Sequence, residues 1–248
     1  AVQAALKTQG LKLKGLHCHI GSQIFDLEPF KLAAIVMLDF CREIYSQTGL
    51  IIEELDLGGG VGIRYLRQDD PCPLADFARL IATTVKEKCA EHNLPLPKLV
   101  LEPGRSIVGE AGTTLYTVGT IKEVPGIRKY VAVDGGMMDN LRTALYDAKY
   151  EAVVASRAND PAEEIVSIAG KACESGDMLI WDVLLPKLRR GDLLACLSTG
   201  AYHYSMANNY NRFPRPAVVF VGGGRADLVV ARESYEDLIR NDLLPSGI

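Results

Sequence analysis

Apolar residues in the first 105 positions switch between the two-residue period of strands and the 3.6-residue period of helices. Three short apolar runs, at 11–22, 51–62 and 98–106, each lead into a glycine-containing turn. Two longer amphipathic runs lie between them, at 27–49 and 73–93. This alternation predicts parallel strands joined by right-handed helical crossovers, which is an α/β arrangement.

The first predicted helix has recognisable ends. Asp26 is suited to cap its amino end, Pro29 falls in its first turn, and Gly49 is a typical stop signal. These residues predict a helix that occupies nearly the whole of 27–49.

The pattern changes after Arg105. Short runs rich in β-branched residues predict strands at 106–124, 129–137, 162–173, 192–199 and 216–223. Helices are predicted only at 181–188, 201–209 and 234–244. We therefore expect an antiparallel β domain over 106–232.

Composition narrows the class of protein. Of the 248 residues 48% are hydrophobic and 23% charged, and the net charge is −4, which gives no support to a nucleic-acid or membrane partner. No apolar run approaches the roughly 18 residues of a membrane span. The six cysteines contain no C-x-x-C pair, so a zinc knuckle is not indicated, and reduced, mostly buried thiols of a cytoplasmic protein are expected.

Polar residues gather where the three predicted parallel strands end. Chemistry in parallel folds lies at the carboxyl ends of strands. The residues found there are His17, His19, Ser22, Gly58, Gly59, Gly60, Glu102, Gly104 and Arg105. Glycine amides, a hydroxyl and an arginine suit a phosphate, although three glycines after a strand also form ordinary tight turns. "DLGGGVG" matches neither the dinucleotide fingerprint nor the P-loop.

A carboxylate beside a phosphate site needs a cationic partner. For Glu102 the protonated ring nitrogen of pyridoxal phosphate (PLP) is such a partner, because a carboxylate there keeps the ring an effective electron sink. His19 could stack on that ring, or it could be an ordinary core histidine.

Six motifs now support a family resemblance. They are "GLHCHIGSQ", "LDLGGGVGI", "LEPGRSIV", "VDGGMMDNLRTALYDAKY", "GKACESGD" and "TGAYHYSMANNYN", in this order from about residue 10 to the end. Together they resemble the fold-III PLP-dependent decarboxylases, and within these the diaminopimelate decarboxylase branch. "CESGD" with "DNLRTALY" is the specific part, since the first three motifs also occur in the wider group, including ornithine decarboxylase.

The resemblance implies roles for residues at the cofactor. His19 would stack on the PLP ring, Glu102 would pair with its nitrogen, and Tyr202 would also touch it. The phosphate region would be held by Ser22, Gly58, Gly59, Gly60, Gly104 and Arg105.

The resemblance also implies substrate contacts. Arg105, Arg142 and Tyr146 would bind the distal end of an amino-acid substrate, Tyr202 would line the same site, and guanidinium groups there favour a second carboxylate over a plain amine tail. Cys173 would reprotonate the substrate after CO₂ leaves, and Glu174 would bind its ammonium; in this family the two act across a homodimer interface.

Each of these substrate-side residues has a plainer alternative. Arg142 and Tyr146 could form a surface helix pair at i, i+4, Cys173 could be a buried thiol, and Tyr202 could be core filler. Asp139 and Asp147 are assigned no role beyond a turn and a solvated face.

The family's Schiff-base lysine was not found in the expected context. Lys7, Lys12 and Lys14 precede the histidine motif, but none lies in the family's lysine motif. A whole (β/α)₈ barrel needs about 250 residues, and only three βα-type strands precede Arg105. We therefore expect a carboxyl-terminal portion of a longer enzyme, with a wide apolar face left open by the absent units.

The expected architecture is α/β plus β. Residues 1–105 would form part of an alanine-racemase-like, PLP-binding (β/α)₈ barrel, 106–232 the antiparallel domain, and 233–248 a terminal helix packed back on the barrel. No metal site is expected. The implied activity is PLP-dependent decarboxylation of meso-2,6-diaminopimelate to L-lysine. Alternatives are a related basic amino-acid decarboxylase and a non-catalytic homologue that binds PLP or a partner.

Overall fold

The computed structural model describes residues 1–247. Its internal contacts divide the chain into two compact units, 1–109 and 110–248, which are described separately. Within the described residues no helix combines the length and apolar character that crossing a membrane requires.

Unit 1 contains a three-stranded parallel sheet in the order β1-β2-β3. Its strands are short: β1 is Gly15–His17, β2 is Glu54–Asp56 and β3 is Lys98–Val100. The connecting helices are α2 (Glu28–Thr48) and α3 (Leu74–Glu91), with α1 (Val2–Lys7) before the sheet and α4 (Arg105–Val108) after it. The predicted strand-helix-strand-helix-strand order is confirmed.

Helix α2 ends at Gly49 as predicted, but its N-cap position is Leu27, one residue after the predicted Asp26. The amide of Glu28 donates a hydrogen bond to the Asp26 carboxylate at 3.0 Å, and Pro29 occupies the first turn. Gly49 ends the helix with a φ of 69°, a left-handed conformation that glycine adopts at little cost.

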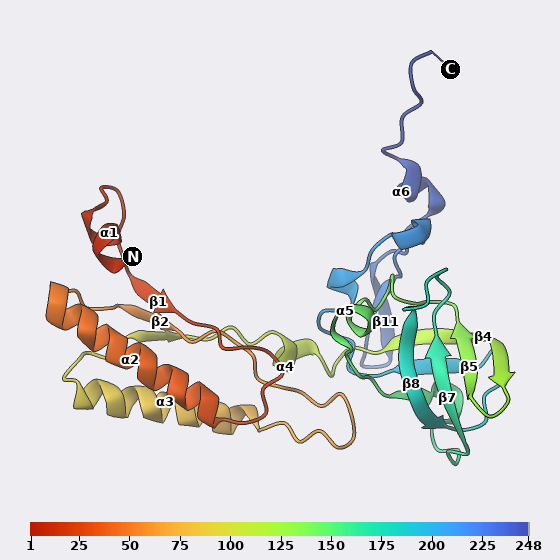
Figure 1. The fold of residues 1–248 in the computed structure, drawn as a ribbon, viewed down its shortest axis with the longest axis horizontal. Helices are drawn as coiled ribbons and strands as arrows, with labels where there is room; N and C mark the ends of the chain where they lie inside the picture. The colour runs from red at the N-terminus through yellow and green to blue at the C-terminus, as the bar shows by residue number, and fades with distance from the viewer. Residues whose placement is uncertain (248) are drawn as a thin grey trace. The chain divides into compact units, whose positions relative to one another are not determined.

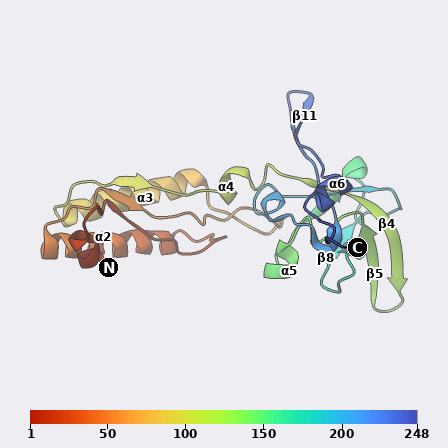
Figure 2. The same cartoon turned by 90° about the horizontal axis from the view of Figure 1, so that it is seen from above.

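The two faces of this sheet differ in polarity. Leu16, Leu55 and Leu99 are aligned across the strands and pack against the helices, which lie side by side in Figures 1 and 2. Residues that flank these leucines point to the opposite face, because strand side chains alternate. That face carries Gly15, His17, Glu54, Asp56, Lys98 and Val100. The open face of the sheet itself is therefore not the apolar face that was expected, since four of these six residues are charged or polar, whereas Leu32, Val36 and Phe40 of α2 are exposed.

Unit 2 is built on a six-stranded sheet in the order β6-β9-β4-β5-β7-β8. Buried aliphatic residues such as Val118, Val131, Val166 and Leu194 fill its core. The strands are β4 (Thr114–Val124), β5 (Arg128–Val133), β6 (Ala152–Val154), β7 (Glu164–Ala169), β8 (Met178–Leu185) and β9 (Leu193–Cys196). The short helices are α5 (Arg142–Tyr146), η1 (Ala155–Arg157), η2 (Tyr204–Met206) and η3 (Tyr210–Arg212).

The β-rich character of unit 2 is as predicted, but several elements differ. The strand predicted at 106–124 begins only at Thr114, the helix predicted at 201–209 is reduced to the short η2, and strand β6 was not predicted. The pair β5–β7 is parallel, whereas every other pair in the sheet is antiparallel. The helix predicted at 181–188 is wrong, because Met178–Leu185 forms strand β8 beside β7. Asp182 interrupts this strand with a φ of 47°, which breaks the strand periodicity that sequence analysis looks for.

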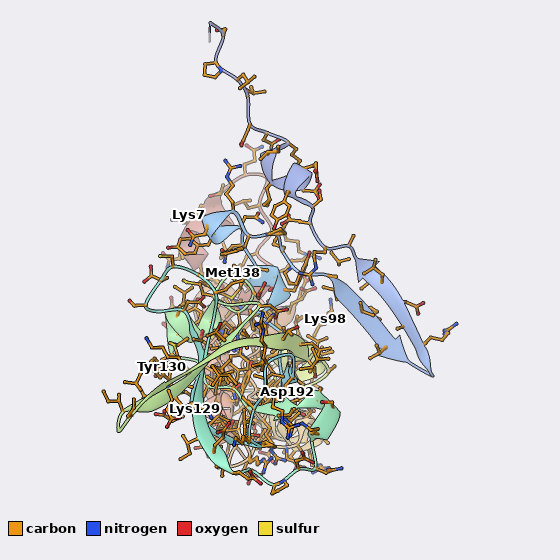
Figure 3. The ribbon with its side chains drawn as sticks, turned by 90° about the vertical axis from the view of Figure 1, so that its right-hand side faces the viewer. Lys7, Lys98, Lys129, Tyr130, Met138 and Asp192 are labelled. Atoms are coloured by element: carbon orange, nitrogen blue, oxygen red, sulfur yellow. The ribbon has the colours of Figure 1, made fainter. Side chains whose placement is uncertain are left out.

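A separate hairpin follows the sheet. It pairs β10 (Val218–Gly222) with β11 (Arg225–Val230), and its turn residues Gly223 and Gly224 have φ of 55° and 75°, as a tight two-residue hairpin turn requires. Figures 2 and 3 show the hairpin extending away from the six-stranded sheet. The last helix, α6 (Tyr235–Ile239), lies inside the predicted 234–244 segment; its packing on the barrel stays a prediction.

Candidate active site

The three predicted glycines at the end of β2 allow close contact between neighbouring loops. A Cβ on Gly59 would lie 2.2 Å from the carbonyl oxygen of Glu102, and one on Gly60 would lie 2.1 Å from that of Gly21. No side chain fits at either position without displacing backbone. The glycine loop is thus held against the loops that follow β1 and β3, and it joins the three strand ends into one edge.

Arg105 is the best-anchored polar side chain at this edge. Its guanidinium is 8% exposed and donates hydrogen bonds to the hydroxyl of Tyr65 and, at 3.0 Å, to the hydroxyl of Ser22. The same guanidinium lies 5.5 Å from the centre of the Tyr65 ring, a cation–π contact. Ser22 and Arg105, which were predicted to gather at the ends of the strands, are therefore in contact.

Glu102 lies among other ionisable groups. Its Oε2 atom is 3.6 Å from Nε2 of His17, and one ligand atom each from His17, Asp56 and Glu102 lie within 4.8 Å of one another. Asp56 also accepts a hydrogen bond from the Gly58 amide at 2.9 Å. Two carboxylates in so small a space favour a cationic group beside them. This observation fits the protonated ring nitrogen of PLP, and the Ser22–Arg105 donor set fits its phosphate.

His19 is exposed, so the core-histidine alternative is wrong. Its Nδ1 atom accepts a hydrogen bond from the Gly59 amide at 3.3 Å, which ties the imidazole to the glycine loop. Gly58 and Gly59 are buried beside it, while Gly104, the residue before α4, is exposed. The neighbouring thiol of Cys18 has a raised pKa, caused first by burial and then by the charge of Asp56.

Unit 2 carries the residues predicted to contact the substrate other than Arg105, and two of its loops arise at one edge. Strands β5 and β7 are parallel, so their carboxyl ends lie together. The loop after β5, residues 134–141, leads into α5 with Arg142 and Tyr146. The loop after β7, residues 170–177, carries Cys173 and Glu174.

Cys173 and Glu174 are both exposed, which rules out the buried-thiol alternative for Cys173. The hydroxyl of Tyr210 donates a hydrogen bond to Oε2 of Glu174 at 3.4 Å. None of the six cysteines in the described part of the chain forms a disulfide.

Arg142 is buried, at 9% exposure, so it does not form the surface helix pair that was considered with Tyr146. Its Nη1 group donates a hydrogen bond to the hydroxyl of Tyr150 at 2.8 Å, and the guanidinium lies 5.9 Å from the Tyr150 ring centre. Tyr146 is 66% exposed. Each unit therefore holds one buried arginine against a tyrosine: Arg105 on Tyr65 and Arg142 on Tyr150.

Tyr202 is 47% exposed and therefore not core filler. Its φ of 56° is uncommon for a residue with a bulky side chain and often marks a functional position. The next residue, His203, is buried with Nε2 at 3.3 Å from the Thr114 hydroxyl. Burial lowers the pKa of His203 to about 4, with a further contribution from the charge of Arg142.

Sequence reasoning missed three partners of the predicted residues. Tyr65 and Tyr150 hold the two arginines, and Asp177 bonds backbone amides of both substrate-side loops. Tyr150 and Asp177 lie inside the quoted motifs "ALYDAKY" and "CESGD". Their closeness in sequence to predicted site residues could have marked them as candidates. No sequence pattern marked Tyr65 as a site residue, because it lies 40 positions away from Arg105.

Comparison with known proteins identifies both parts of the chain. Residues 1–109 match the family described as "Pyridoxal-dependent decarboxylase, pyridoxal binding domain". The diaminopimelate decarboxylase of Bacillus subtilis is 56% identical over 246 residues, which are 98% of this chain and 55% of that protein. The enzyme of Staphylococcus aureus is 50% identical, again over 98% of this chain, and 56% of that protein is covered.

Solved structures agree with the sequence comparison. The diaminopimelate decarboxylase of M. jannaschii in complex with L-lysine matches with a TM-score of 0.92 and 40% identity, over 98% of this chain and 55% of that one. A lysine/ornithine decarboxylase from Vibrio vulnificus, complexed with putrescine, has a TM-score of 0.75 and 25% identity, over 86% and 56% of the two chains. The chain thus spans about half the length of the relatives it matches. Residues 1–109 thus carry the pyridoxal binding domain of the pyridoxal-dependent decarboxylases, and over 98% of its length the chain is similar to diaminopimelate decarboxylases.

Proposed function

We propose that the protein containing this chain decarboxylates meso-2,6-diaminopimelate to L-lysine with PLP as its cofactor. The observation that carries the proposal is the 56% identity with a diaminopimelate decarboxylase over 98% of the chain. Because the chain spans about half of that relative, we propose that it acts as the carboxyl-terminal part of a longer enzyme.

Residues of unit 1 would hold the cofactor. When bound, PLP supplies an electron sink for the electron pair that the departing carboxylate leaves behind. Arg105 and Ser22 would bind its phosphate, with the glycine loop of Gly58, Gly59 and Gly60 and with Gly104 beside the phosphate region. Glu102 would hold the proton on the ring nitrogen, and His19 would cover one face of the ring.

Residues of unit 2 would bind the substrate, with Arg105 of unit 1 as a further contact. Arg142 and Tyr146 would bind the distal carboxylate, because a guanidinium pairs with carboxylate through two parallel hydrogen bonds. Glu174 would bind a substrate ammonium, and Tyr202 would contact both cofactor and substrate.

Cys173 would supply the proton that completes the reaction. Once the bond between Cα and the carboxylate carbon had broken and CO₂ had left, the Sγ–H group of Cys173 would deliver a proton to Cα and become a thiolate. The exposed position of Cys173 on the loop after β7 supports this role. We further propose a homodimer in which Cys173 and Glu174 serve the partner's site, and a cytoplasmic location, which the six unpaired thiols favour.

The Schiff-base lysine has no candidate in the strand-end loops of unit 1. Residues 18–27, 57–73 and 101–109 contain no lysine, and Lys98 is engaged with Glu54 at 3.4 Å on the polar sheet face. We propose that the anchoring lysine lies in a part of the longer enzyme outside this chain.

A product assay tests the function. The intact protein is incubated with PLP and, separately, with meso-diaminopimelate, L-lysine or L-ornithine, and the amines formed are quantified by mass spectrometry. We expect L-lysine from the first substrate and at least a hundredfold less product from the other two, which lack a distal carboxylate. Faster cadaverine or putrescine formation would favour a related basic amino-acid decarboxylase. No product from any substrate, with PLP bound, would favour a non-catalytic homologue.

A further inference from the structure

Asp177 is a buried carboxylate between the two substrate-side loops of unit 2. Its side chain is 3% exposed. The amide of Met137, in the loop after β5, donates a hydrogen bond to Oδ1 at 2.6 Å, and the amide of Ala172, in the loop after β7, donates to Oδ2 at 2.7 Å. One carboxylate therefore satisfies a backbone donor from each loop.

Further backbone bonds close the second loop around the same residue. The amide of Gly170 donates to the carbonyl of Asp177 at 2.8 Å, and the amide of Asp177 donates to the carbonyl of Glu174 at 3.1 Å. A direct bond between the loops runs from the Lys171 amide to the carbonyl of Gly135 at 2.9 Å. The segment with Cys173 and Glu174 is thus fixed at both ends.

Two glycines lie directly against the carboxylate of Asp177. A Cβ on Gly136 would lie 2.5 Å from Oδ2 and a Cβ on Gly170 only 2.1 Å from it. These two glycines allow backbone from both loops to approach the carboxylate. The pKa of Asp177 is raised, first by burial, and the hydrogen bonds from the amides of Ala172 and Met137 offset part of that shift.

We propose that Asp177 is a positioning residue that aligns the loop carrying Cys173 and Glu174 with the segment leading to Arg142. The two amides bond different oxygens of the carboxylate, and an asparagine has an accepting oxygen at only one of these two positions, so it cannot keep both bonds in this geometry. This inference rests on the proposed function, since the linked loops carry the proposed proton donor and lead to the proposed carboxylate-binding arginine, which in the proposed homodimer serve two different sites.

The test compares Asp177→Asn with the matched variant Asp139→Asn. Asp139 is also buried, at 8% exposure, and lies in the same unit, but its carboxylate bonds the amide of Gly136, in its own loop, at 3.0 Å. An asparagine at 139 can keep that bond. The difference between the two variants therefore isolates the link between the loops.

Hydrogen exchange in the intact protein gives a readout that does not depend on activity. In Asp177→Asn we expect exchange at least about tenfold faster in the peptide covering 134–141 or in that covering 170–177, because one amide loses its acceptor. Asp139→Asn should leave the 170–177 peptide unchanged. Wild-type exchange in both peptides of Asp177→Asn, in a folded protein, would overturn the proposal.

Kinetics with meso-diaminopimelate give the second readout. Asp177→Asn should lower kcat at least tenfold while the PLP dissociation constant stays within twofold of wild type, and Asp139→Asn should change kcat less than threefold. An equal loss of kcat in both variants would contradict a linking role. If wild-type protein shows no decarboxylation, the proposed function fails, and the exchange experiment still decides whether Asp177 links the loops.

A second variant covers the case in which Asp177→Asn does not fold. Gly136→Ala keeps the charge and places a Cβ where the carboxylate now lies. It should speed exchange in the 170–177 peptide, although the substituted residue lies in the other loop. No change there would count against the proposal.

Discussion

Both units gather their candidate site residues at the carboxyl ends of parallel strands. The arrangement can be predicted from the sequence in unit 1 but not in unit 2. In unit 1 three parallel strands bring His19, the glycine loop and Glu102 to one edge. In unit 2 a single parallel pair, β5–β7, does the same for two loops in an otherwise antiparallel sheet. The comparison teaches that parallel pairing gathers a site even within a mostly antiparallel domain.

The units differ in how the gathered residues are held. In unit 1 close backbone contacts fix the edge, because glycines let three loops touch. In unit 2 a buried carboxylate, Asp177, bonds the loops through side-chain acceptors. The arginines are alike in both: Arg105 and Arg142 are each buried and each donate to a tyrosine hydroxyl. We therefore expect substitutions in the two units to separate cofactor binding from turnover.

The largest expected effect is on turnover, from Cys173→Ala. Loss of a positioned proton donor should lower kcat by roughly 10²–10⁴-fold, while PLP absorbance of the protein is retained because unit 1 is untouched. Steady-state kinetics with meso-diaminopimelate measure it, and Cys72→Ala serves as the control thiol in unit 1. Unchanged kcat would remove Cys173 from the mechanism.

The second prediction concerns acid stability of unit 2. His203 is buried, and its pKa of about 4 lies below the ordinary 6.5, so the unfolded chain binds a proton first as the pH falls. The neutral imidazole of His203 therefore contributes fully to stability above about pH 6.5. Between pH 6.5 and 4 the free energy of unfolding falls by on the order of 3 kcal/mol.

Chemical denaturation of the intact protein at pH 7.5 and 5, for wild type and His203→Gln, measures this loss. The variant should show a smaller decrease in unfolding free energy between the two pH values. Parallel pH dependence of the two proteins would show that His203 does not titrate as its burial implies.

A smaller effect is expected from Gly59→Ala in unit 1. The added Cβ would lie 2.2 Å from the carbonyl oxygen of Glu102, so the strand-end loops must separate. We expect a loss of about 1–3 kcal/mol in unfolding free energy and weaker PLP binding. Gly222→Ala is the control, since a Cβ there meets no atom within 4 Å. If both substitutions changed unfolding free energy and PLP binding equally, close contact between the strand-end loops would not be what holds the proposed cofactor site together.

In unit 1 most of the fold and of the candidate site could be predicted from the sequence. The alternation of periods predicted both helices and the strand order, and topology then placed Glu102 and Arg105 at the same edge as Ser22. In unit 2 the site residues were predicted from family motifs, but the residues and strand pairing that surround them were not predicted. The pairing of β5 with β7 depends on contacts between segments more than 30 positions apart, which no local pattern reports.

Local irregularity accounts for the remaining errors. Strand β8 was predicted as a helix because the left-handed Asp182 and register shifts against β7 disturb its alternation. The polar open face of the unit 1 sheet was also missed. Short strands of three residues leave too few positions for a facing pattern to emerge from sequence.

The central claim, that the buried arginine of unit 1 binds the cofactor as well as the substrate whereas that of unit 2 binds the substrate alone, is tested most directly by PLP dissociation constants. They are measured by absorbance titration of wild-type protein, Arg105→Met and Arg142→Met. We predict that Arg105→Met weakens PLP binding by roughly 10–100-fold, because a charged hydrogen-bond donor to the phosphate is lost, and that Arg142→Met stays within twofold of wild type. Equal weakening by both substitutions, or none by Arg105→Met, would contradict the division between the units.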